Sequence, residues 1–288
     1  MRWTPQGRSR NLEDRRGGGF GRGAAGMGIG GSVLLIVLSL IFGRDLTGIG
    51  GGAPVDAAPT EAQGDVAVQE SPQEAQLADF VSFVLDTTQA TWARVLPQAT
   101  GQQYRDARLV LFRNAVQSGC GTAQSAMGPF YCPLDEKVYI DLGFYDDLQQ
   151  RFGAPGDFAQ AYVLAHEIGH HVQHILGIDN QVRQAQQGNL GQANQYSVRL
   201  ELQADCLAGV WGHSASQGAQ PVLEPGDVEE GLNAAAAIGD DRLQRQAGGG
   251  VNPEGFTHGS SAQRVAWFRR GLESGDPNAC DTFGQSRP

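Results

Sequence analysis

The longest regular pattern of apolar and polar positions lies between residues 157 and 177. Apolar side chains recur there at helical spacing, at Leu164, Ile168, Val172 and Ile175. Asp157 is a candidate N-cap with Gln160 three residues later, as in a capping box, and Gly177 is a candidate C-terminal stop. The pattern therefore predicts a long, mostly buried helix that no proline interrupts.

Shorter patterns predict the rest of the fold. Residues 137–142 alternate and include β-branched side chains, which predicts a strand. Asp227 with Glu230 is typical of a capping box and predicts a helix that ends near Ile238. Further helices are expected at residues 76–85, 105–112 and 199–211, and around Trp267 and Phe268. We expect a mainly helical α+β domain with a short sheet.

A separate apolar run covers residues 32–42 and follows a glycine-rich stretch. With its small neighbours it gives about 17 residues, at the short end of what a membrane-spanning helix needs. The first 24 residues contain six arginines and two carboxylates, a local charge of +4, so the remainder carries −14 and the whole chain −10. This asymmetry indicates membrane sidedness, with the positive flank inside the cell, and is not typical of nucleic-acid binding.

A cleaved signal peptide is the alternative interpretation of the apolar run. The first small-residue cleavage candidates lie only near Ala57 and Ala58, so an uncleaved anchor is favoured. We therefore expect a cytoplasmic arginine-rich tail at residues 1–25, a transmembrane anchor at 26–43, a flexible linker at 44–75 and an extracytoplasmic domain at 76–288.

Four cysteines, Cys120, Cys132, Cys206 and Cys280, suit an exported domain with disulfides. A Cys120–Cys132 bond closes a short loop, worth about 3 kcal/mol by loop entropy. A Cys206–Cys280 bond ties the C-terminus to the helix at 199–211. Three pairings are open, and the sequence does not choose among them.

Residues His166, Glu167 and His170 form an H-E-x-x-H motif inside the long predicted helix. Imidazoles four residues apart on a helix lie about 6 Å apart along its axis, on one face, and can share a zinc ion. Glu167 then lies beside the metal, where it can act as a base toward water. The motif predicts a zinc peptidase centre with one ion.

Two further histidines follow the motif. His174 lies about 12 Å along the helix from His166, too far to bind the same ion together with His170. His171 and His174 are therefore expected to support the site from outside or to lie at the surface.

A third ligand must come from another element. The predicted helix at 199–211 carries Glu201 and Asp205 four residues apart, on one face and among apolar neighbours. A carboxylate completes the His₂Glu class of zinc site, which keeps a fourth position for water. We assign Glu201 as the ligand, and Asp205 as the hydrogen-bond partner of a ligating imidazole.

Taken together, these motifs resemble the family described as "putative neutral zinc metallopeptidase", which comprises bacterial membrane-anchored proteins. The resemblance extends over nearly the whole chain outside the linker, and more remotely to other gluzincins with an E-x-x-A-D second motif. The residues that carry it are HEIGHH at 166–171, ELQADCLAGVW at 201–211, and the segments 1–3, 11–16, 128–133 and 257–264. It implies a zincin-like domain in a bacterial plasma membrane.

The closing segment adds two candidates through the same resemblance. Related membrane gluzincins have a T-H-P stretch near the catalytic centre, with an arginine six residues after the histidine; here these are His258 and Arg264, with Gly259 in place of the proline. The resemblance implies that His258 donates to the oxyanion of the tetrahedral intermediate and that Arg264 braces the site or the substrate carbonyl.

The sequence therefore predicts a membrane-anchored zinc endopeptidase whose base is Glu167 and whose partners are protein or peptide substrates. The strand at 137–142 is a candidate edge for pairing with an extended peptide. Two alternatives remain open: a zinc-binding scaffold or regulator without catalysis, and a hydrolase of cell-wall peptides. Intact Glu167 argues against the scaffold, because metal binding alone does not need it.

Overall fold

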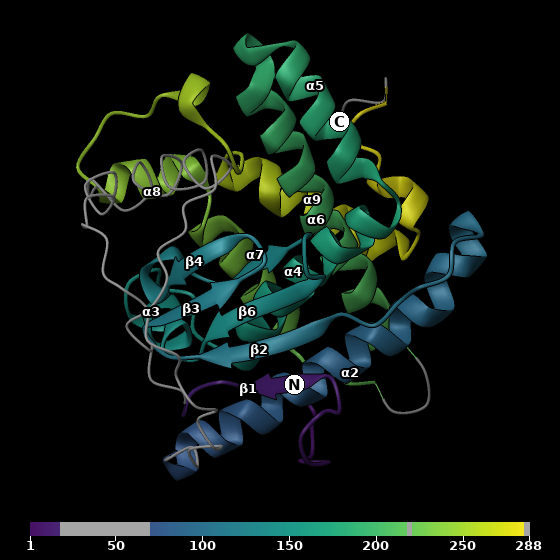
Figure 1. Ribbon diagram of the computed structural model, residues 1–288, viewed down its shortest axis with the longest axis vertical. Helices are drawn as coiled ribbons and strands as arrows, with labels where there is room; N and C mark the ends of the chain where they lie inside the picture. Colours follow the sequence, from purple (N-terminus) through teal and green to yellow (C-terminus); the bar gives the residue numbers. More distant parts are fainter. Residues whose placement is uncertain (18–69, 218–220, 285–288) are drawn as a thin grey trace, which may run out of the picture.

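A mixed four-stranded sheet forms one layer of the structure, a computed structural model that describes residues 1–17, 70–217 and 221–284 (Figure 1). The strand order is β1 (Leu12–Asp14), β2 (Arg108–Phe112), β6 (Lys137–Asp141) and β5 (Phe130–Cys132). The first three strands run parallel, and β5 is antiparallel to β6. A separate hairpin consists of β3 (Ala115–Ser118) and β4 (Gly121–Gln124).

The predicted helix at residues 105–112 is wrong, because this segment contains strand β2. Its side chains are buried on both faces: Leu109 and Leu111 join the main core, whereas Val110 and Phe112 pack in a second cluster with the hairpin. A strand covered on both sides is a continuous apolar run without alternation, which periodicity does not distinguish from a buried helix. The predicted strand at 137–142 is confirmed as β6. Its predicted place at the edge of the sheet is wrong, because β6 pairs with β2 on one side and with the edge strand β5 on the other.

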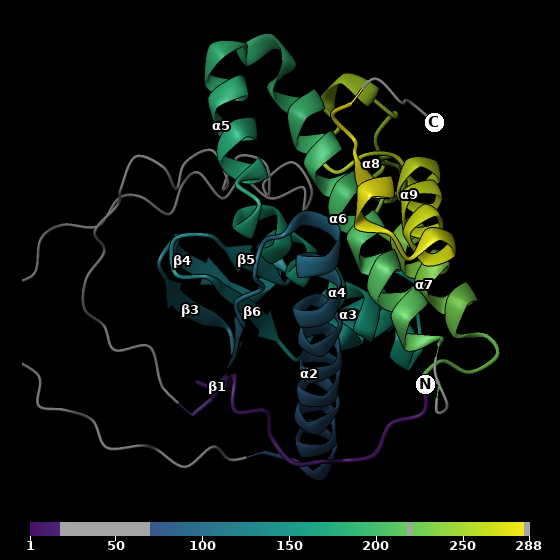
Figure 2. The same cartoon turned by 90° about the vertical axis from the view of Figure 1, so that its right-hand side faces the viewer.

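Helices form the second layer and make the described structure mainly helical. The α-helices are α2 (Pro72–Thr100), α3 (Phe144–Gln150), α4 (Asp157–Ile175), α5 (Ile178–Gly188), α6 (Ala193–Ala215), α7 (Asp227–Ala237), α8 (Asp240–Gln246) and α9 (Ser261–Ser274). The 3-10 turns are η2 (Ser125–Met127), η3 (Leu190–Gln192), η4 (Pro253–Gly255) and η5 (Pro277–Cys280). Helix α4 packs against α2, α6 and α7, while α5 and the start of α6 project beyond the sheet (Figure 2).

The predicted capping boxes at Asp157 and Asp227 are not formed. Both aspartates are the first residues of their helices, after Gly156 and Gly226, and neither helix has a side-chain cap at that glycine. The carboxylate of Glu230 instead accepts a hydrogen bond from the backbone N–H of Phe158, at 3.1 Å. The α4 N-terminus is therefore capped from a neighbouring helix, a contact across 72 residues that local pattern does not reveal.

Glycines allow α4, α6 and α9 to approach closely. A Cβ atom on Gly169 of α4 would lie 2.9 Å from the backbone oxygen of Ala204 in α6. A Cβ on Gly271 of α9 would lie 1.8 Å from the backbone oxygen of Cys206. Only glycine permits such contacts without moving a helix, so Gly169 sets the distance between the two helices that carry the motif residues.

The N-terminal segment, residues 1–17, packs against the rest of the described structure and is not a separate tail. Strand β1 pairs with β2, and the Trp3 ring lies edge-on to Phe80 of α2. The ammonium group of Met1 lies 2.8 Å from the Asp157 carboxylate. The arginines that suggested membrane sidedness form ion pairs with carboxylates of the same chain, at Arg2, Arg8, Arg10, Arg15 and Arg16.

The domain boundary also differs from the predicted one, since α2 begins at Pro72 and its N-cap is Ser71. The predicted anchor at residues 26–43 lies outside the described residues. Within the described ranges, no helix has both the length and the hydrophobicity that crossing a bilayer requires.

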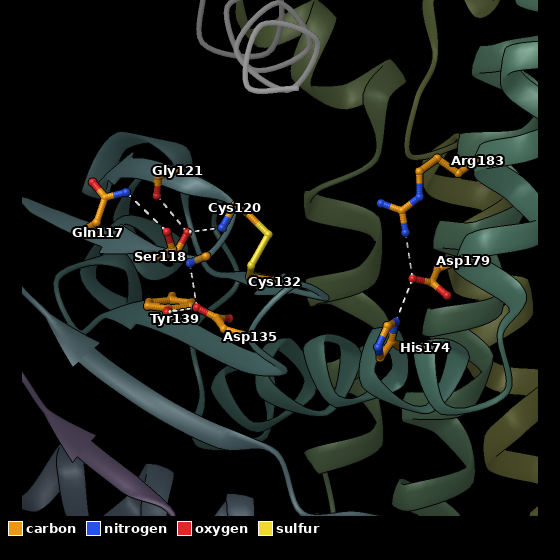
Figure 3. The surroundings of a disulfide bond; sticks show 11 residues. Gln117, Ser118, Cys120, Gly121, Cys132, Asp135, Tyr139, His174, Asp179 and Arg183 are labelled. Carbon is orange, nitrogen blue, oxygen red and sulfur yellow. Dashed lines mark hydrogen bonds and ion pairs between the residues drawn. A yellow bond between two sulfur atoms is a disulfide. The ribbon is translucent and has the colours of Figure 1, made fainter. Parts of the chain in front are cut away.

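One of the three pairings open to the cysteines is present, as two disulfides. Cys120 and Cys132 link the β3–β4 turn to β5, close to the Asp135 carboxylate that accepts a hydrogen bond from Tyr139 (Figure 3). Cys206 of α6 is bonded to Cys280 of η5. The second bond ties the C-terminal segment to the helix that carries Glu201 and Asp205.

Candidate metal centre

Helices α4 and α6 bring His166, His170 and Glu201 together. The Nε2 atom of His166 lies 3.2 Å from one Glu201 oxygen, and the Nε2 atom of His170 lies 3.5 Å from the other. One candidate ligand atom from each residue lies within 4.8 Å of the other two. The side chains of His166 and Glu201 thus meet although they are 35 positions apart in the sequence, as expected for a third ligand from a second helix.

Glu167 lies beside this cluster on the same helix and lines the same cleft. The cleft has a volume of about 450 Å³ and lies between α4, α5, α6 and the edge strand β5. Its apolar lining includes Phe144, Phe152, Val163, Ile238 and Leu243. A buried carboxylate therefore faces a space that a substrate can enter.

Asp205 contacts the outer face of His166. Its carboxylate lies 2.9 Å from Nδ1 of His166, as predicted for a residue that fixes the orientation of a ligating imidazole. Arg264 donates to both oxygens of the same carboxylate, from Nε and Nη2, each at 2.8 Å. Tyr162 donates its hydroxyl to Asp205 as well.

The position of Arg264 separates the two roles considered for it. Its side chain is buried, and its guanidinium also donates to the backbone oxygen of Ile238 at 3.3 Å. Because these donors are engaged with Asp205 and Ile238, the geometry fits a brace that holds the Asp205–His166 pair. It does not favour a direct contact with a substrate carbonyl.

His258 lines the same cleft and is partly exposed. Its Nδ1 atom lies 3.2 Å from the carboxylate of Asp240, which also accepts hydrogen bonds from the backbone N–H groups of Thr257, His258 and Gly259. Asp240 therefore holds both the loop and the ring. This places an imidazole at the lining of the cleft, and its role as an oxyanion donor stays a prediction.

His171 and His174 do not join the cluster. The Nε2 atom of His171 lies 2.7 Å from the backbone oxygen of Arg105, and its Nδ1 atom 2.9 Å from the hydroxyl of Tyr131 on β5. His174 faces Asp179, which also pairs with Arg183 across one turn of α5 (Figure 3). Both histidines thus join α4 to neighbouring elements.

Two contributing residues were not predicted. Tyr162 lies four residues before His166, and Gln173 lies three residues after His170 with its Oε1 atom 2.8 Å from Nδ1 of that ring. These offsets place each side chain next to its histidine on the helix surface. Helical spacing from His166 and His170 could therefore have identified Tyr162 and Gln173 from the sequence.

Burial and pairing shift the ionisation of the cluster. Burial alone lowers the pKa of His166, but hydrogen bonds to Asp205 and Glu201 outweigh it and raise this pKa to about 10. Burial raises the pKa of Glu201, yet the charges of His170 and His258 hold it well below its usual range. Burial raises the pKa of Glu167, with the two motif histidines opposing the shift. Glu201 is therefore favoured as an anion that pairs with the imidazoles around it.

The donor set fits a zinc ion. The Nδ1 atoms of both histidines are engaged outside the cluster, so each Nε2 faces Glu201. Two imidazole nitrogens and a carboxylate are the donors of the His₂Glu class. A second group of carboxylates, from Asp157, Asp227 and Glu230, also lies within ligand distance. The Met1 ammonium lies 2.8 Å from Asp157 and 3.3 Å from Asp227, so these carboxylates already have a positively charged partner.

The chain is similar to several curated bacterial proteins. The chain is 52% identical to the Escherichia coli K12 protein named "Uncharacterized protein YpfJ" over 295 residues, which covers 99% of this chain and 100% of that one. It is 48% identical over 207 residues to "Uncharacterized protein Rv2575" of Mycobacterium tuberculosis H37Rv and to "Uncharacterized protein Mb2605" of Mycobacterium bovis. These two matches cover 69% of this chain and 68% of the relatives. No solved structure matches significantly.

The family comparison covers nearly the whole sequence. Residues 1–283 match the family described as "Putative neutral zinc metallopeptidase". This range includes the docked N-terminal segment, both motif helices and the loop that carries His258. The chain therefore belongs to this zinc metallopeptidase family.

Proposed function

We propose that this chain is a zinc-dependent endopeptidase with His166, His170 and Glu201 as zinc ligands and Glu167 as general base. The observation that carries the proposal is the convergence of these ligands beside Glu167 in a substrate-sized cleft. A binding scaffold has no use for a buried carboxylate next to the metal, whereas peptide hydrolysis requires a base at that place.

The proposed reaction divides between the metal and the protein. When bound, zinc supplies a Lewis acid that polarises the scissile carbonyl and lowers the pKa of water. Glu167 accepts a proton from the attacking water while the oxygen of that water forms a bond to the carbonyl carbon. As the carbon–nitrogen bond breaks, Glu167 delivers that proton to the leaving amine. His258 donates a hydrogen bond to the oxyanion.

The test is peptide cleavage by the full chain and by Glu167→Gln, with zinc content measured on the same samples. We expect the substitution to reduce turnover by roughly 10²–10⁴-fold, the usual contribution of a general base, while the zinc content stays unchanged. Glu273→Gln on α9 is a matched control, because this glutamate is exposed and lies outside the cleft.

The substrate pool should combine a mixed peptide library with cell-wall peptides, so that the preferred class is read from the same experiment. Retained zinc with no cleavage of either pool by the unaltered chain would favour the scaffold alternative. Equal cleavage by Glu167→Gln and the unaltered chain would contradict the role of Glu167.

For location we propose attachment to the bacterial plasma membrane through the apolar run at residues 26–43. A single span places residues 1–17 and residues 70–284 on opposite sides of the bilayer, whereas the packing of β1 on β2 requires them on one side. Protease added to intact cells whose outer barrier is permeable to it distinguishes the two cases, because it shows whether residues 1–17 and the domain lie on the same side of the membrane. Release of the full chain by alkaline washing of membranes would contradict insertion of residues 26–43 into the bilayer.

A further inference from the structure

The two motif histidines have different partners at their outer nitrogens. His166 faces the carboxylate of Asp205, but His170 faces a neutral amide, the Oε1 atom of Gln173 at 2.8 Å. Gln173 is the first member of a chain of hydrogen bonds that leads away from the cluster through α6 to the C-terminal segment. We refer to Gln173, Gln203 and their acceptors as the amide relay.

Each bond of the amide relay has a defined partner. The Nε2 group of Gln173 donates to the backbone oxygen of Leu200 at 2.7 Å and to Oε1 of Gln203 at 3.0 Å. The Nε2 group of Gln203 donates in turn to the backbone oxygen of Cys280, also at 3.0 Å. Cys280 is held by its disulfide to Cys206 on α6, three residues from Gln203.

The relay has only one consistent direction. A backbone carbonyl can accept but cannot donate, so the oxygen of Cys280 requires the NH₂ group of Gln203 to face it. The Oε1 atom of Gln203 then faces Gln173. That oxygen and the carbonyl of Leu200 both require the NH₂ group of Gln173 to point toward α6. The Oε1 atom of Gln173 is therefore left facing His170.

This direction determines the tautomer of His170. An amide oxygen accepts, so the proton of the neutral ring lies on Nδ1 and the lone pair of Nε2 faces Glu201. Gln173 is completely buried and Gln203 is 6% exposed, so flipping either amide would leave buried polar atoms without partners. The protein thus holds the ring ready to bind metal.

We propose that Gln173 is a positioning residue that fixes His170 as a zinc ligand, and that Gln203 enforces its orientation. The inference rests on the proposed zinc site but not on peptide hydrolysis. The amide orients His170 without adding charge, while Asp205 supplies an anion at His166. Losing an outer partner of a ligating histidine commonly weakens metal binding about 10–100-fold.

The experiment compares Gln173→Met and Gln203→Met in the full-length protein. Methionine keeps the length of the side chain but removes the amide. Gln89→Met is the matched control, because Gln89 on α2 is also buried, at 4% exposed, and takes no part in the relay. Zinc affinity is measured by competition with a chelator, and ligand geometry by the visible absorption spectrum of the cobalt-substituted protein.

We expect Gln173→Met to weaken zinc binding by roughly 10–100-fold and to alter the cobalt spectrum. Gln203→Met should have a smaller effect in the same direction, because the carbonyl of Leu200 still orients Gln173. Gln89→Met should match the unaltered chain in both measurements. A role that is only structural would lower the unfolding temperature of the metal-free protein without changing the cobalt spectrum.

Zinc binding and a cobalt spectrum equal to those of Gln89→Met would overturn the proposal. If Gln173→Met does not fold, Gln203→Met decides by the same criteria. If the unaltered chain binds no zinc, both the proposed function and the proposed role of the amide relay are contradicted. If it binds zinc tightly and neither substitution changes the binding, only the role of the amide relay is contradicted.

Discussion

At the scale of single residues, the site depends on which buried groups are held and which remain free. Asp205 is completely buried between His166, Tyr162 and Arg264, so its charge is fully paired. His258, in contrast, is held at one ring nitrogen by Asp240 and lines the open cleft. This difference separates a residue that supports the metal site from one that can meet the substrate.

Replacing His258 by Ala should lower turnover by roughly 10²–10³-fold, the usual loss of one oxyanion donor, because it removes the donor and leaves the ligands in place. Zinc content should stay at the level of the unaltered chain. His213→Ala is the control, since this ring contacts the backbone oxygen of Leu272, away from the cleft. Loss of zinc from His258→Ala would instead indicate a ligand or structural role.

The residues that sequence could indicate are those whose chemistry is tied to local spacing. The H-E-x-x-H motif and the pair Glu201 and Asp205 each lie on one turn of one helix, so spacing alone places them on a shared face. The role of Arg264 was left open because its partner Asp205 lies 59 residues away. The partners of Gln173 on α6 were out of reach for the same reason.

At the scale of elements, the separation of α4 and α6 decides whether the ligands meet. Gly169 contacts the α6 backbone at Ala204, within the stretch between Glu201 and Asp205. The metal cluster therefore rests on a helix contact that has no room for a methyl group. The existence of α4 and α6 was predictable from the sequence, but this distance follows from tertiary packing.

Gly169→Ala should force the helices apart and cost about 1–3 kcal/mol of unfolding free energy, the usual range for overpacking. Zinc affinity should fall as well, because His170 and Glu201 lie on opposite sides of the contact. Gly188→Ala in α5 is a matched control, since a Cβ there meets no atom within 4 Å. Chemical denaturation and chelator competition measure both quantities; equal values for the two variants would contradict this account of α4–α6 packing.

At the scale of the whole molecule, the N-terminal segment and the C-terminal segment both close onto the central helices. Strand β1 completes the sheet at one edge, and the Cys206–Cys280 disulfide fixes the other end of the chain to α6. The sequence predicted a cytoplasmic arginine-rich tail at residues 1–25, because its arginines were counted against Glu13 and Asp14 alone. Further partners, such as Glu70 and Asp106, are distant in sequence, and charge patterning does not identify them.

Docking of β1 predicts a pH-dependent contribution from Glu13. Burial raises the pKa of Glu13, but hydrogen bonds from Lys137, Arg15 and Arg108 outweigh it and lower this pKa to about 2 from a reference of 4.5. The ion pairs therefore stabilise the fold fully above about pH 4.5, and this stability is lost as the pH falls toward 2.

Glu13→Gln should accordingly reduce the unfolding free energy at pH 7 by on the order of 1 kcal/mol, and the difference from the unaltered chain should shrink between pH 5 and about pH 3. Denaturation curves at several pH values measure this difference, with Glu273→Gln as control. A difference that is absent at pH 7, or that grows on acidification, would mean that β1 is not docked in solution.

The metal centre is tested most directly by the zinc content and zinc affinity of the purified chain, compared with Glu201→Gln. We expect one zinc per chain in the unaltered protein and markedly weaker binding in the variant, because α6 then lacks its anionic ligand. An unaltered chain that binds no zinc, or a Glu201→Gln variant that binds one zinc as tightly as the unaltered chain, would contradict a zinc site at His166, His170 and Glu201.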